Sequence, residues 1–502
     1  MDKKSLDQLG LTIDRACDNN NYEELLLIIS NNEEYVETLE NSKIKTNLYY
    51  FLANCWGGLR NIKHQNDEKK YIWQYEQKEL FKEIYYLRKA IGESGFDSFE
   101  IDLQISIYTN LANSFRHYGR TINALKYFNK ALALHPNFFM ALVNKAICFE
   151  RYAQLIYDDG HIELLLRNAY FGYIKALDEI NIHLENSTHD FEYYISVKSN
   201  VELSIASIEN LLTKECLDEN IDLNEHKLGQ YKNEIKYRKW TLDNTLFLNP
   251  INDLGSFSIA AHDPLNLPSL TTKIGTGFPK YITYFNQIKQ EFITNRYLLY
   301  EGLSHLSNKY YDKETSIIND YDYNIYDINT EKIKLSFKGF YSLFDKIAYF
   351  LNEYFKLYYN ENHVDFKKIW MNKNNRKTLN SKLEIFENLA LRGLYLISKD
   401  LYFYQNENDD NFIEALEPEA KKINEIRNHL EHKFIMIKSL DIGNDQENSE
   451  QIFYLTEDEL HEKTIYLAQL AREAIIYLSL AVHNEERKKD DSDIFGEQCE
   501  IL

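Results

Sequence analysis

The chain has 502 residues and a formal net charge of −21 at pH 7, with only 6 prolines and 17 glycines. Its length suits two to four domains of ordinary size, and so few turn residues favour long helices over tight β-hairpins. The acidic charge argues against a surface made for general nucleic-acid binding, which needs clustered lysines and arginines, so any nucleic-acid site has to be local. The composition therefore predicts an all-α protein of several domains.

The five cysteines lie far apart, without any C-x-x-C spacing, at Cys17, Cys55, Cys148, Cys216 and Cys499. The first residues, MDKKSLDQLG, are polar and unlike a secretory signal, and no run of about 18 apolar residues is long enough to span a bilayer. We therefore expect a reduced, cytoplasmic protein without a membrane segment, a disulfide framework or a cysteine-based zinc site. No metal and no cofactor are expected.

The first half of the chain contains a helical repeat. Between residues 107 and 138, one apolar helix face ends at Gly119 and a second ends at Pro136, with the spacing of a tetratricopeptide repeat. The positions expected to be buried on these two faces are Tyr108, Leu111, Ala112, Phe115, Ala124, Phe128 and Ala131. The next unit follows after about 34 residues with a lengthened turn, and its expected faces carry Leu142, Ala146, Phe149, Ala169, Tyr173 and Ala176. Residues 1–248 are predicted to form a tetratricopeptide-like helical repeat domain that binds a partner.

Residues 249–280 form a contrasting segment, because four of the six prolines fall within it: Pro250, Pro264, Pro268 and Pro279. A helix cannot run through such a segment, so it is predicted to be a connector between two helical domains. The dipeptide His262–Asp263 before a proline has two interpretations, a turn and a metal or catalytic pair, and the turn is favoured.

Five helical stretches follow the connector, at residues 281–303, 334–359, 383–403, 417–437 and 456–486, and a capping box from Thr456 to Glu459 opens the last one. They are long enough for an antiparallel bundle, which is predicted to span residues 281–490. Residues 491–502 are charged and aperiodic, as is typical of a frayed tail.

The fourth of these helices carries the most unusual polar stretch, INEIRNHLEHKF at residues 423–434, with Arg427, Asn428, His429, Glu431 and His432. At about 100° per residue, Arg427 and Glu431 share a helix face, whereas Arg427 and His432 lie about 140° apart. One straight helix is therefore not expected to bring Arg427 and His432 together. The stretch is either a solvated helix face with an Arg427–Glu431 ion pair or a site where chemistry is done.

The context of this stretch resembles the HEPN superfamily of helical domains. The signature of that superfamily is an arginine, a polar residue and, after four to six intervening positions, a histidine, and this chain has it late in a C-terminal bundle. Together with the degenerate repeats, the connector and the sequence FDKIAYFLNEYF, it is similar to a bacterial HEPN subfamily. The resemblance implies a metal-independent endoribonuclease, often a toxin or phage-defence effector, that dimerises through this helix. It assigns Arg427, Asn428 and His432 as catalytic residues and leaves accessory roles for His429 and Glu431 open.

The same residue types suit RNA cleavage by the neighbouring 2′-hydroxyl. That reaction needs a base, an acid and positive charge at the phosphate; a histidine can transfer protons near neutral pH, and an arginine fork can hold two phosphate oxygens. Because one helix does not bring Arg427 and His432 together, a second copy across a two-fold axis is expected to complete the site.

A basic segment without any acidic residue, 367–382, is the expected RNA contact. Its candidate RNA-binding residues are Lys367, Lys368, Trp370, Lys373, Arg376 and Lys377, with Trp370 as a stacking platform for bases. The alternative is a flexible solubilising loop.

Two functions of different classes remain open on the sequence alone. One is a HEPN endoribonuclease that acts on RNA as a homodimer and is regulated by its repeat domain, to which a protein or phage-derived trigger binds. The other is a non-catalytic scaffold or nucleotide- or RNA-binding module in which the repeats mediate protein–protein interaction.

Overall fold

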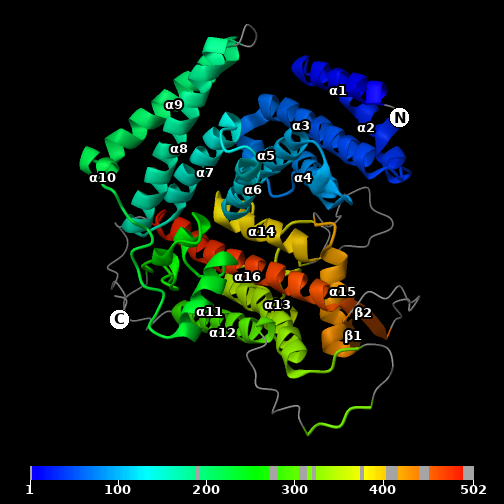
Figure 1. The fold of residues 1–502 in the computed structure, drawn as a ribbon, viewed down its shortest axis with the longest axis vertical. Coiled ribbons are helices and arrows are strands. Elements are labelled where there is room, and N and C mark those ends of the chain that lie inside the picture. Colours follow the sequence, from blue (N-terminus) through cyan, green and yellow to red (C-terminus); the bar gives the residue numbers. More distant parts are fainter. Residues whose placement is uncertain are drawn as a thin grey trace. The chain divides into compact units, whose positions relative to one another are not determined.

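The computed structural model describes residues 3–186, 191–271, 280–304, 314–318, 324–373, 378–402, 417–439 and 451–489. By its backbone contacts the chain divides into two compact units (Figure 1). The first is centred on Met1–Ile221, and the second on Asp222–Phe403 and Glu419–Leu502. We describe each unit by itself.

The helices of the first unit pack mostly against their neighbours along the chain, and α1 also packs against α3. They are α1 (Lys3–Asp18), α2 (Tyr22–Glu37), α3 (Ser42–Ile72), α4 (Lys78–Gly92), α5 (Ile101–Tyr118), α6 (Thr121–Leu134), α7 (Phe139–Leu155), α8 (Asp159–Asn186), α9 (Phe191–Leu211) and the short α10 (Lys214–Asp218).

The pair α5 and α6 shows how the sequence specifies these boundaries. Gly119 follows α5 with a φ of 104°, a left-handed conformation that glycine adopts without strain, and its N–H bonds the carbonyls of Phe115 and Arg116. The apolar positions expected on both helix faces are all buried. The helix pair is confirmed, whereas its membership in a tetratricopeptide-like array stays a prediction.

The second unit contains α11 (Lys232–Asp243), α12 (Lys280–Leu303), α13 (Ile328–Tyr354), α14 (Leu389–Leu401), α15 (Ala420–His432) and α16 (Glu457–Glu486). α13 packs against both α12 and α16, and α14 packs against α16 (Figure 1). All five helices expected after the connector are present, and the all-α class is confirmed.

The fourth helix of the bundle was expected to run to residue 437, and this boundary is wrong. α15 ends at His432, and Phe434–Lys438 forms strand β1, which pairs in parallel with β2 (Ile452–Thr456). The sequence FIMIK alternates more exposed and buried side chains, with Ile435 and Ile437 facing inward, which is the period of a strand rather than of a helix. Because the strand begins two residues after His432, the polar stretch lies at the end of its helix.

Helix α16 begins with the predicted capping box. The Thr456 hydroxyl accepts a hydrogen bond from the N–H of Glu459 at 3.2 Å, and the Glu459 carboxylate accepts one from the N–H of Thr456 at 2.9 Å. Among the described residues, α16 is the one helix long and apolar enough to cross a membrane by length and composition, but 83% of its most apolar window is buried inside the protein. Such burial is usual for the core helix of a soluble domain.

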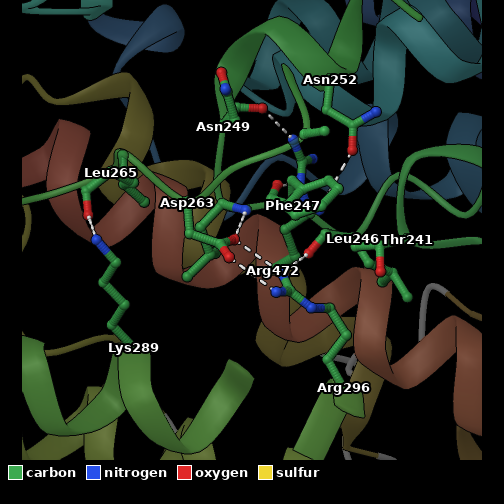
Figure 2. Close-up of polar contacts among 12 residues, drawn as sticks. Thr241, Leu246, Phe247, Asn249, Asn252, Asp263, Leu265, Lys289, Arg296 and Arg472 are labelled. Atoms are coloured by element: carbon green, nitrogen blue, oxygen red, sulfur yellow. Dashed lines mark hydrogen bonds and ion pairs between the residues drawn. The ribbon is translucent and has the colours of Figure 1, made fainter. Parts of the chain in front are cut away.

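The described part of the Pro/Gly-rich segment, residues 249–271, is packed inside the second unit, which includes the chain from Asp222 onward. Figure 2 shows two arginine side chains that reach into this segment. Arg472 of α16 donates to the carbonyls of Phe247 and Asn249, at 2.5 and 2.8 Å, and to the carboxylate of Asp253 at 2.6 Å. The irregular backbone thus finds hydrogen-bond donors in a buried side chain, which replaces the missing helix or strand partners.

The second arginine, Arg296 of α12, explains the His262–Asp263 dipeptide. Both oxygens of Asp263 accept from the Arg296 guanidinium at 2.8 Å, and one of them also accepts from the N–H of Leu248 at 2.7 Å (Figure 2). Burial works to lower the pKa of Arg296, but the hydrogen bonds and charge of Asp263 outweigh it and raise the pKa. Asp263 is therefore a structural ion-pair partner, as the turn interpretation of the dipeptide implies.

Candidate active site

Helix α15 carries its polar stretch in its last turns. It packs against α13, α14 and the two strands, with Ile423 and Ile426 fully buried. After Ile426, Arg427 and Asn428 are half-buried, and Glu431 and His432 are exposed.

Arg427 is held by two neighbours on its own helix. Its Nη2 lies 2.9 Å from Oε2 of Glu431, and its Nη1 donates to Oδ1 of Asn428 at 3.0 Å. The guanidinium also lies over the ring of Tyr341 from α13, 5.4 Å from the ring centre. With 30% of its side chain exposed, Arg427 is fixed in place but reachable from solvent.

His432 ends the helix and reaches the same carboxylate. Its Nε2 lies 3.5 Å from Oε2 of Glu431, and 67% of the side chain is exposed. The expectation that one helix keeps Arg427 and His432 apart therefore needs a correction. The long arginine side chain reaches along the helix to Glu431, which is the direct sequence neighbour of His432, and the carboxylate joins the two groups.

His429, the first of the two histidines, has a structural role. It is buried, its Nδ1 lies 2.8 Å from the carbonyl oxygen of Glu425, and its ring stacks on Phe453 of β2 with 5.3 Å between centres. A carbonyl only accepts, so Nδ1 carries the proton. His429 fastens α15 to the small sheet and faces away from the solvent-exposed site.

Two tyrosines and an aspartate that the motif does not predict lie below Arg427. Tyr341 and Tyr402 hydrogen-bond each other, and burial raises the pKa of both hydroxyls. Burial also raises the pKa of Asp345, although its hydrogen bond from the N–H of Phe366, at 3.0 Å, and the charge of Arg427 oppose that shift. Glu353, two turns further along α13, pairs with Lys280 at 2.6 Å.

The predicted stacking platform is wrong, because the Trp370 side chain is completely buried. Its ring packs edge-on against Phe366 and Tyr395, at 5.7 and 5.4 Å between centres. Burying the largest apolar side chain of the segment stabilises the unit more than leaving it in solvent. Trp370 is therefore unable to stack on a base.

The basic residues around Trp370 differ in their surroundings. Lys368 pairs with Asp365, and partial burial lowers the pKa of Lys367. Lys373 is exposed and donates a hydrogen bond to the carbonyl of Tyr358. Arg376 and Lys377 lie outside the described residues.

In the part of the chain that the structure describes, no three or more histidine, cysteine, aspartate or glutamate side chains are grouped to hold a metal ion. The polar groups instead form an arginine, carboxylate and histidine arrangement at the exposed end of a helix. Such a set can bind a phosphate and transfer a proton.

A helical bundle with this arrangement on its fourth helix defines an HEPN-type domain. Residues 272–485 match the family model described as LA2681-like HEPN, so this part of the chain belongs to the HEPN superfamily. Among curated proteins and among solved structures, no significant match to the chain is found. The predicted HEPN domain is confirmed, whereas the repeat domain of the predicted subfamily stays a prediction.

Proposed function

We propose that the second unit is a metal-independent endoribonuclease that acts as a toxin or phage-defence effector. The observation that supports this most directly is the joining of Arg427 and His432 through Oε2 of Glu431, at 2.9 and 3.5 Å, on an exposed helix end of an HEPN domain. Domains of this superfamily are often ribonucleases. An arginine fork beside an exposed histidine supplies positive charge for the phosphate and a group that transfers protons, both of which RNA cleavage by a 2′-hydroxyl requires.

In the proposed reaction the 2′-oxygen attacks phosphorus while the 5′-oxygen leaves, giving a 2′,3′-cyclic phosphate and a 5′-hydroxyl. The Arg427 guanidinium holds the phosphate oxygens, on which negative charge accumulates. His432 takes the proton of the 2′-hydroxyl or gives one to the 5′-oxygen, since imidazole does both near neutral pH. Asn428, bonded to Nη1 of Arg427, keeps the fork in one orientation.

Two copies of the chain would supply two copies of His432, one as base and one as acid, so we propose that the unit works as a homodimer with the two α15 helices facing one cleft. Each copy contributes one set of Arg427, Glu431 and His432, which already meet within one chain, and the second copy adds the other His432. Light scattering on the purified protein should give the mass of a dimer; the mass of a monomer would contradict the proposal.

Mixing two inactive variants tests how the set is shared. If each chain contributes a complete set, Arg427→Ala mixed with His432→Ala stays inactive. Recovery of activity in the mixture would show instead that the arginine of one copy works with the histidine of the other.

A non-catalytic binding module is the second candidate, and one observation favours it. Both terminal nitrogens of Arg427 are engaged by side chains of the same helix, as in an ordinary surface ion pair between residues four apart. In this alternative the stretch is a polar helix face, and the chain binds RNA or a protein without cutting it.

One comparison separates these two functions. Purified protein and the His432→Ala variant are incubated with total RNA in EDTA, and the fragments are examined for 2′,3′-cyclic phosphate ends. Fragments from the wild type and none from the variant support the ribonuclease. Equal fragmentation by both, or none by either under any tested condition, favours the binding module.

Control by the first unit is part of the same proposal. A nuclease that acts on host RNA is toxic, so we propose that the helical first unit binds a protein or phage-derived trigger and releases the activity. Overproduced wild type should then slow growth, either always or only during infection. Equal growth of wild type and Arg427→Ala in both conditions would contradict this role.

A further inference from the structure

The turn that follows α13 has an unusual backbone. Lys356 and Tyr358 both have positive φ, 49° and 58°, although neither is glycine. Leu357 between them is buried, so the two flanking side chains point outward, and 64% of Tyr358 is exposed. Non-glycine residues in this conformation are uncommon and gather at binding sites, because the surrounding structure has to hold them there.

Asn352 near the end of α13 provides that support. Its Oδ1 accepts from the N–H of Tyr359 at 2.8 Å, and its Nδ2 donates to the carbonyl of Tyr359 at 3.1 Å. The N–H of Leu357 also bonds the carbonyl of Asn352 at 3.0 Å. These hydrogen bonds hold the backbone of the turn from its buried side, so the backbone that carries the exposed Tyr358 ring is held in one conformation.

Two lysines from the basic segment complete the surface around this turn. Lys382 donates to the carbonyl of Lys356 at 3.3 Å, and its ammonium lies 3.8 Å from the centre of the Tyr358 ring. Lys373 donates to the carbonyl of Tyr358 and lies 5.0 Å from the ring centre of Tyr359. An ammonium has three N–H groups, so each lysine keeps donors for a further acceptor.

The charges of this surface favour an anion. Partial loss of solvent and the neighbouring Lys382 ammonium both lower the pKa of Lys373, which shows that two positive groups repel each other there. Lys356 adds a third exposed positive charge on the same turn. A phosphate placed between the ammonium groups would relieve the repulsion.

We propose that Lys356, Tyr358, Lys373 and Lys382, the Tyr358 cluster, form a binding site for single-stranded nucleic acid. A base stacks on the exposed part of the Tyr358 ring, and the neighbouring phosphates bind the three ammonium groups. An unstacked base is required, which favours a single strand over a duplex. The identification of the natural strand as the RNA substrate rests on the proposed function.

The cluster is connected to the candidate active site through the basic segment and α13. Just before this segment, the N–H of Phe366 bonds Asp345, whose pKa the charge of Arg427 works to lower, and within the segment Lys373 donates to the carbonyl of Tyr358. The stretch of α13 from Asp345 to Tyr354 is about 14 Å long.

Fluorescence anisotropy with labelled 12-nucleotide RNA, the same DNA sequence and duplex RNA tests the cluster in the full-length protein. Tyr358→Asn removes the ring and suits the left-handed backbone, so we expect the fold to be kept and single-strand affinity to fall about 10-fold. Tyr358→Phe keeps the stacking face and should bind within about twofold of wild type. The control Tyr231→Ala removes an exposed tyrosine of the same unit and should change nothing.

The lysines are tested by salt dependence. Lys373→Ala with Lys382→Ala should reduce the slope of log affinity against log salt concentration by about 1.4, since each phosphate contact on a single strand contributes about 0.7. The matched control is Lys232→Ala with Lys236→Ala, two exposed lysines of α11 in the same unit. Equal binding by Tyr358→Asn and wild type, or a salt slope that the cluster variant leaves unchanged, would overturn the proposal.

The outcomes for the cluster and for catalysis are separable. Loss of binding in Tyr358→Asn supports the cluster even where wild type cuts no RNA. Tight binding by Tyr358→Asn overturns the cluster even where cleavage by wild type is confirmed. Comparison of the RNA and DNA strands shows whether the site distinguishes them, and preferred binding of the duplex would contradict the stacking of an unpaired base.

Discussion

Arg427 and His432 contact the same atom, Oε2 of Glu431, at 2.9 Å from Nη2 and 3.5 Å from Nε2. The signature of the superfamily assigns a role to the arginine, the polar residue and the histidine, but not to the residue before the histidine. In this chain that residue joins the other two. We therefore infer that Glu431 is a positioning residue.

Glu431→Gln should lower the cleavage rate about 10-fold, because the amide keeps the size of the side chain but loses the charge that holds the Arg427 guanidinium beside His432. Tenfold corresponds to about 1.4 kcal/mol, near the lower end of what a charged hydrogen bond contributes. RNA affinity should stay the same or rise, since a negative charge beside the phosphate is removed. Single-turnover cleavage and binding are measured on the same samples.

The matched control for this change is Glu425→Gln, one and a half turns earlier on α15, where the carboxylate pairs only loosely with Lys421 at 3.9 Å. It should cleave as fast as wild type. A Glu431→Gln variant that also cleaves at the wild-type rate would show that the shared carboxylate is incidental.

Variants of the three catalytic candidates should differ in how far they lose cleavage. His432→Ala should abolish cleavage and leave RNA binding largely intact, because a neutral imidazole adds little attraction for phosphate. Arg427→Lys should also fail, since an ammonium keeps the charge but loses the two-pronged geometry. Asn428→Ala should be milder, as it removes a positioning hydrogen bond worth about 1–2 kcal/mol. Cleavage by His432→Ala at the wild-type rate would contradict the assignment.

The sequence predicted the helices of the second unit well because their apolar periods and the capping box are local signals. It missed strand β1, since FIMIK follows directly on a helical pattern and its partner strand, residues 452–456, begins 18 residues further along the chain. The helix boundary at His432 therefore came only from the structure.

The candidate site was predictable in part. The motif identified Arg427, Asn428 and His432, and the Arg427–Glu431 ion pair follows from the spacing of four residues. The positions of Trp370 and Tyr358 did not follow from sequence, because both are aromatic residues near lysines. Only the packing of Trp370 against Phe366 and Tyr395 shows which of the two rings remains outside.

Asp345 gives a prediction about pH. Its pKa in the folded protein is raised above the ordinary value of 3.8, chiefly by burial, so the folded state holds the proton more tightly than the unfolded state. This contribution to stability is fully present below pH 3.8 and is lost as the pH rises through the folded pKa. Asp345→Asn has no such proton, and its amide oxygen still accepts from Phe366. The variant should therefore gain stability relative to wild type between pH 4 and pH 7.

Urea denaturation of wild type and Asp345→Asn at pH 4, 5.5 and 7 measures this difference. Asp243→Asn serves as the control, because Asp243 lies exposed at the end of α11. A difference between wild type and Asp345→Asn that does not change with pH would show that the Asp345 carboxyl is not destabilised by burial.

The last prediction concerns the ion pair that holds the Pro/Gly-rich segment. Arg472 and Asp253 are both buried, with 2.6 Å between Nη1 and Oδ1. Arg472 also donates hydrogen bonds to the carbonyls of Phe247 and Asn249. Asp253→Ala leaves the guanidinium charge buried without its carboxylate, which costs about 3–5 kcal/mol. Glu353→Ala breaks an exposed pair with Lys280 and should cost about 1 kcal/mol or less. Urea denaturation followed by circular dichroism compares the two. Equal stability of both variants would mean that the Arg472–Asp253 pair does not anchor the segment to the unit.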